Sequence, residues 1–215
     1  MSAQEELEKI AEEVRACTLC PLSKGRTRAV PGEGPADAEI MFIGEGPGFH
    51  EDRQGRPFVG AAGQFLEELL ASIGMRRDQV YITNVVKCRP PGNRDPLPEE
   101  VAACKPYLDR QIEAIKPKIV VTLGRHSMAR YLPGASISKV HGQARRVGEV
   151  ICFPMLHPAA GLHQPRWKPL IEEDIKKLPA LLAEARRQLN KSEPEQMAVP
   201  KDAESPEDYQ QLSLF

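Results

Sequence analysis

Four of the five cysteines have the number and spacing of a metal centre. Cys17 and Cys20 form a C-x2-C pair, and Cys88 and Cys104 follow as C-x15-C. Four thiolates bind either zinc or an iron–sulfur cluster, and the spacing alone does not separate these two. A redox-active C-x2-C pair and a set of unrelated thiols remain as alternatives. The fifth cysteine, Cys152, lies in an apolar run, which indicates a small buried side chain.

Three polar or glycine-rich segments each follow a segment that is typical of a buried strand. They are Gly44-Glu-Gly-Pro-Gly48, Asn84 and His157-Pro158. In an open α/β sheet, ligands bind outside the carboxyl ends of the strands. We therefore expect these three segments to build one ligand site.

The elements that must position these residues alternate along the chain. Short apolar runs predict strands at 39–44, 79–84, 118–124 and 150–155. Helical apolar spacing occurs at 61–73, 98–115 and 168–189, and Pro179 lies at a kink or in an early turn. Strands that alternate with helices favour parallel pairing. We predict an α/β protein with three αβα layers and a central, mainly parallel four-stranded sheet.

The net charge of −1 over 215 residues conceals three zones. Residues 1–13 carry −4 and residues 192–215 carry −5, so residues 14–191 carry +8. Lys and Arg cluster at 24–28, 87–94, 139–146 and 166–168, on predicted loops. Four such clusters indicate an anionic partner rather than an ordinary solvated surface.

The composition and the two ends of the chain limit its class. No run of 18 uncharged apolar residues is present, which excludes a transmembrane helix. We therefore expect that the protein does not bind a membrane. The acidic, helix-like N-terminus lacks the regions of a signal peptide, so we expect a cytoplasmic protein. We predict one domain over residues 1–190. Residues 191–215 are polar, acidic and proline-containing, which predicts a disordered tail.

Four motifs in series resemble the family 4 uracil-DNA glycosylases, the iron–sulfur members of that superfamily. They are Gly44-Glu-Gly-Pro-Gly-Phe-His-Glu-Asp52, Gly55-Arg-Pro-Phe-Val-Gly60, Tyr81-Ile-Thr-Asn…Asp95 and Pro154-Met-Leu-His-Pro-Ala159. The resemblance covers about residues 10–185. It implies a uracil-DNA glycosylase-like fold and a base excision repair enzyme that flips uracil out of DNA and hydrolyses its N-glycosidic bond, leaving an abasic site. It also implies a [4Fe-4S] cluster on Cys17, Cys20, Cys88 and Cys104.

The same resemblance gives three residues a role at the base. The Asn84 amide would accept from uracil N3–H and donate to O4, a pattern that cytosine does not match. The flipped base would stack on Phe58. His157 would stabilise the negative charge that grows on O2 as the bond breaks.

The first glycine-rich motif supplies carboxylates and close backbone approach. Related glycosylase families carry an Asp at the position of Gly46. Here the available carboxylates are Glu45 and Glu51, and the Gly46 and Gly48 amides could approach the base. We expect Glu51 to be catalytic. It would either polarise water and stabilise the cationic sugar, or fill the space beside C5 and exclude thymine.

Further residues would contact DNA or a protein partner. Leu162 is a candidate wedge for the gap that the flipped base leaves, and residues 139–146 and 166–168 would contact phosphates. The terminal residues resemble a bacterial peptide that docks on the DNA polymerase sliding clamp, which favours a bacterial, nucleoid-associated monomer. The clamp-binding residues would be Gln211, Leu212, Leu214 and Phe215.

Two other function classes fit part of the sequence. A non-enzymatic iron–sulfur module that binds DNA or senses damage would keep the cysteines and basic loops, but it would need neither Asn84 nor His157. A phosphate- or nucleotide-binding α/β protein would use residues 44–48, but this class leaves Phe58 and the cysteines unexplained.

Overall fold

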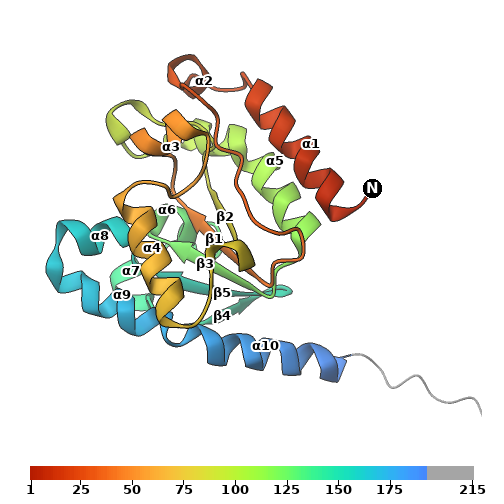
Figure 1. The fold of residues 1–215 in the computed structure, drawn as a ribbon, viewed down its shortest axis with the longest axis vertical. Helices are drawn as coiled ribbons and strands as arrows, with labels where there is room; N and C mark the ends of the chain where they lie inside the picture. Colours follow the sequence, from red (N-terminus) through yellow and green to blue (C-terminus); the bar gives the residue numbers. More distant parts are fainter. Residues whose placement is uncertain (193–215) are drawn as a thin grey trace, which may run out of the picture.

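The computed structural model describes residues 1–192, and its centre is a five-stranded sheet (Figure 1). The strand order is β2-β1-β3-β5-β4. Four strands are parallel neighbours, and they are β1 (Ile40–Gly44), β2 (Tyr81–Asn84), β3 (Ile119–Leu123) and β5 (Val150–Met155). Every residue of β1, β2 and β3 is buried, as expected for strands that are covered on both faces. The predicted α/β class and the four predicted strands are confirmed.

A fifth strand, β4 (Arg145–Val147), corrects the predicted number of four. It pairs antiparallel with β5 at the edge of the sheet, and Gly148 turns the chain between them with a φ of 60°. The strand has only three residues, and its two arginines are exposed. It was missed because an edge strand that faces solvent needs no apolar run. Charged side chains at an edge also discourage pairing with another chain.

Ten helices and three short 3-10 turns surround the sheet within the described residues. The helices are α1 (Ala3–Ala16), α2 (Leu22–Gly25), α3 (Phe49–Gln54), α4 (Ala61–Ser72), α5 (Pro98–Ile115), α6 (Arg125–Ala129), α7 (Ile137–Val140), α8 (Pro158–His163), α9 (Lys168–Ile175) and α10 (Leu178–Ser192). The 3-10 turns are η1 (Arg77–Gln79), η2 (Pro91–Asn93) and η3 (Pro165–Trp167). No helix of residues 1–192 is long and apolar enough to cross a membrane.

The core has two parts, one on each face of the sheet. Helices α1 and α5 pack on one face, with Leu7, Ile10 and Leu108 in the same apolar cluster as Met41 of β1. Helices α4, α9 and α10 pack on the other, where Phe42 of β1 belongs to the second cluster. Figure 1 shows the two groups of helices on opposite sides of the strands. Alternate residues of β1 therefore enter opposite cores, which gives the predicted three layers.

The predicted helices at 61–73 and 98–115 are confirmed as α4 and α5. The predicted helix at 168–189 is instead two helices, α9 and α10, which are separated at residues 176–177. Pro179 is the second residue of α10. Proline has no N–H for a preceding turn, but the first turn of a new helix does not need that donor. The break therefore falls just before the proline.

The order of the strands places a switch point between β1 and β3. The chain moves from β1 to β2 on one side and returns to β3 on the other. Loops that leave the carboxyl ends of β1 and β3 therefore run in opposite directions and open a crevice between them. The segment that begins at Gly44 leaves β1 at this edge, and Gly124 follows β3.

Candidate active site

A cavity of about 370 Å³ lies at this edge of the sheet. All seven residues predicted for base binding or catalysis line it, and they are Glu45, Gly46, Gly48, Glu51, Phe58, Asn84 and His157. The other lining residues are Pro47, Ala62, Pro90, Asn93, Arg94, Ala159 and His163. The structure thus brings together side chains that are separated by more than one hundred positions in the chain.

Asn84, the last residue of β2, brings an unpaired acceptor to the cavity. Its side chain is buried, and its Oδ1 atom accepts no hydrogen bond from the described residues. Leaving a buried amide oxygen unpaired costs about 1–3 kcal/mol. Gly44 makes the position possible, because a Cβ there would lie 2.4 Å from Asn84 Oδ1 and 2.7 Å from the Phe58 ring. The cavity can therefore receive an N–H donor at this oxygen.

The His157 imidazole presents a donor to the same cavity. The Ala159 N–H donates to its Nδ1 at 3.1 Å, at the start of α8. An Nδ1 that accepts a hydrogen bond leaves the ring proton on Nε2. Burial lowers the pKa of His157 to about 4, although the charge of Glu51 raises it slightly. The ring is consequently neutral near pH 7, with an Nε2–H free to donate.

Phe58 forms an aromatic wall of the cavity. Its ring is buried and stacks on the His157 ring, with 5.6 Å between centroids and an angle of 26° between planes. The Phe58 backbone lies in the left-handed region at φ 50°, which L-residues rarely adopt. Helix α4 approaches it closely, because a Cβ on Gly63 would lie 1.9 Å from the Phe58 carbonyl oxygen.

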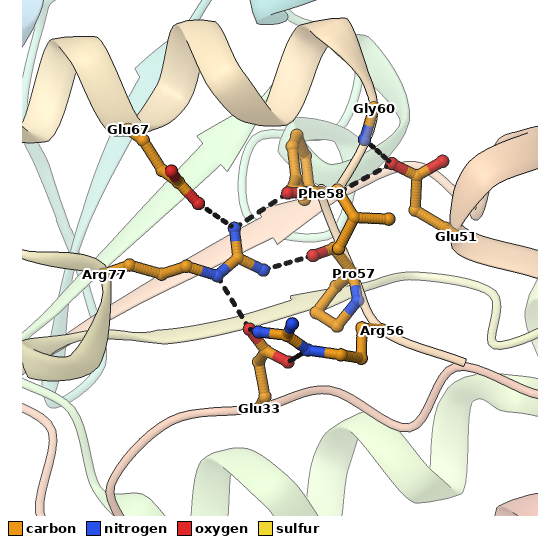
Figure 2. Close-up of polar contacts among 9 residues, drawn as sticks. Glu33, Glu51, Arg56, Pro57, Phe58, Gly60, Glu67 and Arg77 are labelled. Carbon is orange, nitrogen blue, oxygen red and sulfur yellow. Dashed lines mark hydrogen bonds and ion pairs between the residues drawn. The ribbon is translucent and has the colours of Figure 1, made fainter. Parts of the chain in front are cut away.

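The Glu51 carboxylate accepts three backbone hydrogen bonds. The Val59 and Gly60 amides each donate to Oε1 at 2.8 Å, and the Gly48 amide donates to Oε2 at 3.1 Å. Figure 2 shows the contact with Gly60 beside the Phe58 backbone. A carboxylate has about four acceptor positions, so most of its capacity is used here. Glu51 thereby joins the loop after β1 to the loop that carries Phe58.

The predicted glycines and Glu45 complete the first loop. A Cβ on Gly46 would lie 2.8 Å from Val86 Cγ2, and one on Gly48 would lie 2.8 Å from Glu51 Oε2. Both positions are therefore crowded even for alanine. Burial raises the pKa of Glu45, and Asp95 raises it further, whereas His126 lowers it.

The four candidate ligand cysteines gather beside the α1–α5 core. Cys88 and Cys104 are buried, and Cys20 packs against the same apolar cluster. Burial raises the pKa of Cys88, and the neighbouring Cys20 and Cys17 raise it further. Burial likewise raises the pKa of Cys104 to about 11, with Cys88 and Cys20 contributing. The thiols therefore lie within electrostatic reach of one another.

This donor set fits a group bound by four thiolates. Burial raises the pKa of Cys88 and Cys104, so these two thiols need a cationic centre before they ionise, and a metal centre provides it. Arg26 Nη1 also donates to Cys88 Sγ at 3.1 Å. Cys152 lies apart from this set, fully buried in β5 between β3 and β4, which agrees with the predicted small apolar role.

Lys87 corrects the sequence-based view of the basic cluster at 87–94. It is 1% exposed, and its Nζ donates to Thr83 Oγ1 at 2.6 Å, to Gln111 Oε1 at 2.7 Å and to the Asn84 carbonyl at 2.9 Å. Burial lowers its pKa to about 7. A lysine that has three acceptors arranged around it can be buried, but it does not face a partner.

Other basic segments and the candidate wedge lie on the surface. Lys139, Arg145, Arg166 and Lys168 are exposed. Leu162 is 45% exposed on α8, between the cavity-lining residues 159 and 163. The clamp-binding residues 211–215 lie outside the described residues, as does nearly all of the predicted tail, although α10 continues through Ser192.

Two functional contributors carry no signal in the sequence motifs. Arg77 and Glu33 lie outside the motifs, yet both support the loop of Phe58 (Figure 2). Arg94, by contrast, lies within the third motif, lines the cavity and forms an ion pair with the buried Glu100 at 2.6 Å. Only the long-range folding of the chain brings Arg77 and Glu33 to the loop of Phe58.

Comparison with known proteins defines the class to which this fold and cavity belong. Residues 31–188 match the family model of the uracil DNA glycosylase superfamily. A type-4 uracil-DNA glycosylase of Sulfurisphaera tokodaii is 54% identical over 192 residues, which cover 84% of this chain and 87% of the relative. The type-4 uracil-DNA glycosylase of Saccharolobus solfataricus is 49% identical, over 82% of this chain and 87% of the relative. That of Thermotoga maritima is 48% identical, over 82% of this chain and 95% of the relative.

The chain therefore belongs to the type-4 uracil-DNA glycosylases. It is a DNA repair enzyme that flips uracil out of DNA and hydrolyses the N-glycosidic bond. Archaeal proteins stand among these relatives, so the comparisons do not support the predicted bacterial source.

Proposed function

We propose that Asn84 and Phe58 recognise the flipped uracil. The unpaired Asn84 Oδ1 beside the Phe58 ring is the observation that carries this proposal. That oxygen would accept from uracil N3–H, and the amide nitrogen would donate to O4. Cytosine has an acceptor at N3 and a donor at N4, so it would leave both pairs unmade at a cost of about 1–3 kcal/mol each.

His157 would act as the donor to uracil O2. A donor that is aimed at the oxygen where charge grows stabilises the transition state more than the bound substrate. Support comes from the neutral ring and from the use of Nδ1 by the Ala159 amide, which leaves Nε2–H for the substrate. In the overall reaction, the C1′–N1 bond breaks, the water oxygen bonds to C1′, and the uracil anion takes up the proton that the water loses.

Glu51 would hold the two loops of the cavity in their positions and would place negative charge near the cationic sugar. Its three backbone partners support an orienting role, and its position in the cavity wall supports the electrostatic role. N–H groups engage both oxygens of Glu51. We therefore prefer this role to the alternative, in which Glu51 fills the space beside C5 and excludes thymine. Glu45 and the Gly46 and Gly48 backbones would complete the wall.

A [4Fe-4S] cluster on Cys17, Cys20, Cys88 and Cys104 is the cofactor that we propose. The four gathered thiols and the type-4 family support it. The cluster would tie the end of α1 and the segment after β2 to α5. Measurement of iron and sulfide per chain tests it, and zinc in place of iron would contradict it.

The surface and the tail would serve DNA and one protein partner. Leu162 would enter the base stack of the DNA, and residues 139–146 and 166–168 would contact phosphates.

On the basis of sequence alone, we propose that the enzyme is a monomeric, nucleoid-associated cytoplasmic protein that binds the sliding clamp. The residues that bind the clamp would be Gln211, Leu212, Leu214 and Phe215. Deleting residues 211–215 should abolish clamp binding and spare excision on short oligonucleotides, and equal clamp affinity without them would refute the proposal.

The variant Asn84→Ala tests the recognition proposal. Loss of one or two base contacts should slow single-turnover excision about 10- to 100-fold, from about 1–3 kcal/mol of lost pairing. The melting temperature should change little, because the lost oxygen has no partner in the folded protein. Excision at the full rate would rule out this role for Asn84.

A further inference from the structure

The backbone at Phe58 needs support, because its conformation is unfavourable for a residue with a side chain. Phe58 has a φ of 50°, and its ring is buried against His157. An L-residue leaves the left-handed region unless its surroundings hold it there. The groups that contact residues 57–60 therefore decide where the aromatic wall lies.

Arg77 contacts two consecutive carbonyls of this loop. Its Nη1 donates to the Phe58 oxygen at 2.8 Å, and its Nη2 donates to the Pro57 oxygen (Figure 2). The Arg77 side chain is 15% exposed. A guanidinium has a rigid planar fork of donors, so two adjacent carbonyls fix both the position and the orientation of the loop.

Glu33 holds the guanidinium in place through its Nε atom. Arg77 Nε donates to Glu33 Oε1 at 2.7 Å, and Arg56 Nε donates to Glu33 Oε2 at 2.8 Å. Burial alone would raise the pKa of Glu33, but the hydrogen bonds from Arg56 and Arg77 bring it below its usual value. The carboxylate therefore stays ionised near neutral pH.

Glu33 is itself attached to the strand that carries Asn84. Its amide donates to the Ile82 oxygen at 2.9 Å, and its own oxygen accepts from the Ile82 amide at 2.8 Å. Asn84 lies two residues further along β2. Through Glu33 and Arg77, the same strand therefore sets both the amide edge and the aromatic wall of the cavity.

We propose that Arg77, held by Glu33, is a positioning residue that fixes the Phe58 ring relative to Asn84 for stacking on uracil. The proposal rests on the proposed stacking role of Phe58. Arg77 does not line the cavity and acts only through the loop. Glu51 accepts from the Val59 and Gly60 amides, and the Gly63 amide donates to the Gly60 oxygen, so Arg77 provides one of three supports for this loop.

A double-mutant cycle between Arg77 and Phe58 tests this proposal. Arg77→Ala should lower the single-turnover excision rate by up to roughly 100-fold, since a displacement of about 1 Å can have that effect. It should also raise the inhibition constant of free uracil, which a loss of stability alone would not do below the unfolding transition. In a Phe58→Ala background, Arg77→Ala should cause less than about a two-fold further loss.

The neighbouring arginine provides the matched control. Arg76 lies one position away, has a 70% exposed side chain, and pairs only with Asp78 among the described residues. Arg76→Ala removes the same charge and should keep excision and uracil inhibition within about two-fold. If Arg77→Ala folds poorly, Glu33→Gln provides a milder change, with a smaller loss that Phe58→Ala should again abolish.

The outcomes separate this proposal from the one on which it rests. If Phe58→Ala slows excision while Arg77→Ala does not, or if the two losses multiply fully, the positioning role is wrong and stacking on Phe58 stands. If Phe58→Ala excises uracil at the full rate, both proposals are wrong.

Discussion

The cavity at the carboxyl edge of the sheet and the cysteine site are built in opposite ways. The cavity is formed by loops that hydrogen bonds hold together, with a strained backbone at Phe58 and an unpaired oxygen on Asn84. The cysteine site is part of an apolar cluster that α1 and α5 complete. Polar atoms left free for a ligand weaken a fold, whereas buried apolar contacts stabilise it. Variants in the first region should thus affect activity, and variants in the second should affect stability.

The two regions nevertheless meet in one short segment. Asn84 ends β2 at the cavity, and Cys88 enters the cysteine site four residues later. Between them, Lys87 Nζ donates to the Asn84 carbonyl from a fully buried position. The cysteine site can therefore support the cavity without contributing an atom to it.

The largest expected loss of activity comes from His157→Ala. Removing one donor to a developing oxyanion typically lowers the rate about 10²- to 10³-fold. Single-turnover excision of uracil from a short duplex measures it, and circular dichroism and thermal melting should show an intact fold. His50→Ala is the matched control, because His50 is exposed and does not line the cavity. Full activity in His157→Ala would contradict the assignment.

A change at a cysteine should have its main effect on stability. Cys104→Ser should lower the iron content and reduce the melting temperature by on the order of 10 °C, because metal binding and folding are coupled. Cys152→Ala should keep the iron, since that thiol lies in β5. The contrast between the two regions would fail if Cys104→Ser kept the melting temperature of the unchanged protein.

The smallest expected effect is that of mild acid on excision. With the pKa of His157 lowered to about 4, the ring stays neutral from pH 8 to pH 5, so its contribution to the rate should be flat there. Near pH 4, protonation of Nδ1 removes the acceptor of the Ala159 amide, and the rate should fall. A pH series of single-turnover rates measures this dependence. If the rate fell by half near pH 6.5, and Glu51→Gln did not move that midpoint, the assignment of His157 as a neutral donor would be contradicted.

The same shift predicts the direction of acid destabilisation. Between pH 6.5 and about pH 4, His157 binds more protons in the unfolded chain than in the folded one. Its contribution to the free energy of unfolding is therefore complete above pH 6.5 and is lost progressively as the pH falls through this window. Urea unfolding of the unchanged protein and of His157→Ala at pH 7 and pH 5 would isolate it.

Much of the fold and of the cavity could be predicted from the sequence because the signals are local. The apolar runs of β1, β2, β3 and β5 reflect burial on both faces, and the residues that line the cavity stand in compact motifs. The misses have long-range causes. Lys87 resembles a surface cation until Gln111, 24 positions away, comes to bind it. Arg77 reaches the Phe58 loop from 19 positions away, which no spacing rule indicates.

The contact between Gly46 and Val86 limits how this cavity can evolve. Any side chain at position 46 would begin with a Cβ that lies 2.8 Å from Val86 Cγ2. Gly46→Asp alone therefore meets a methyl group on a different loop, and a smaller residue at position 86 must come first or together with it. We therefore expect positions 46 and 86 to be coupled, so that a carboxylate at position 46 is better tolerated when residue 86 is smaller.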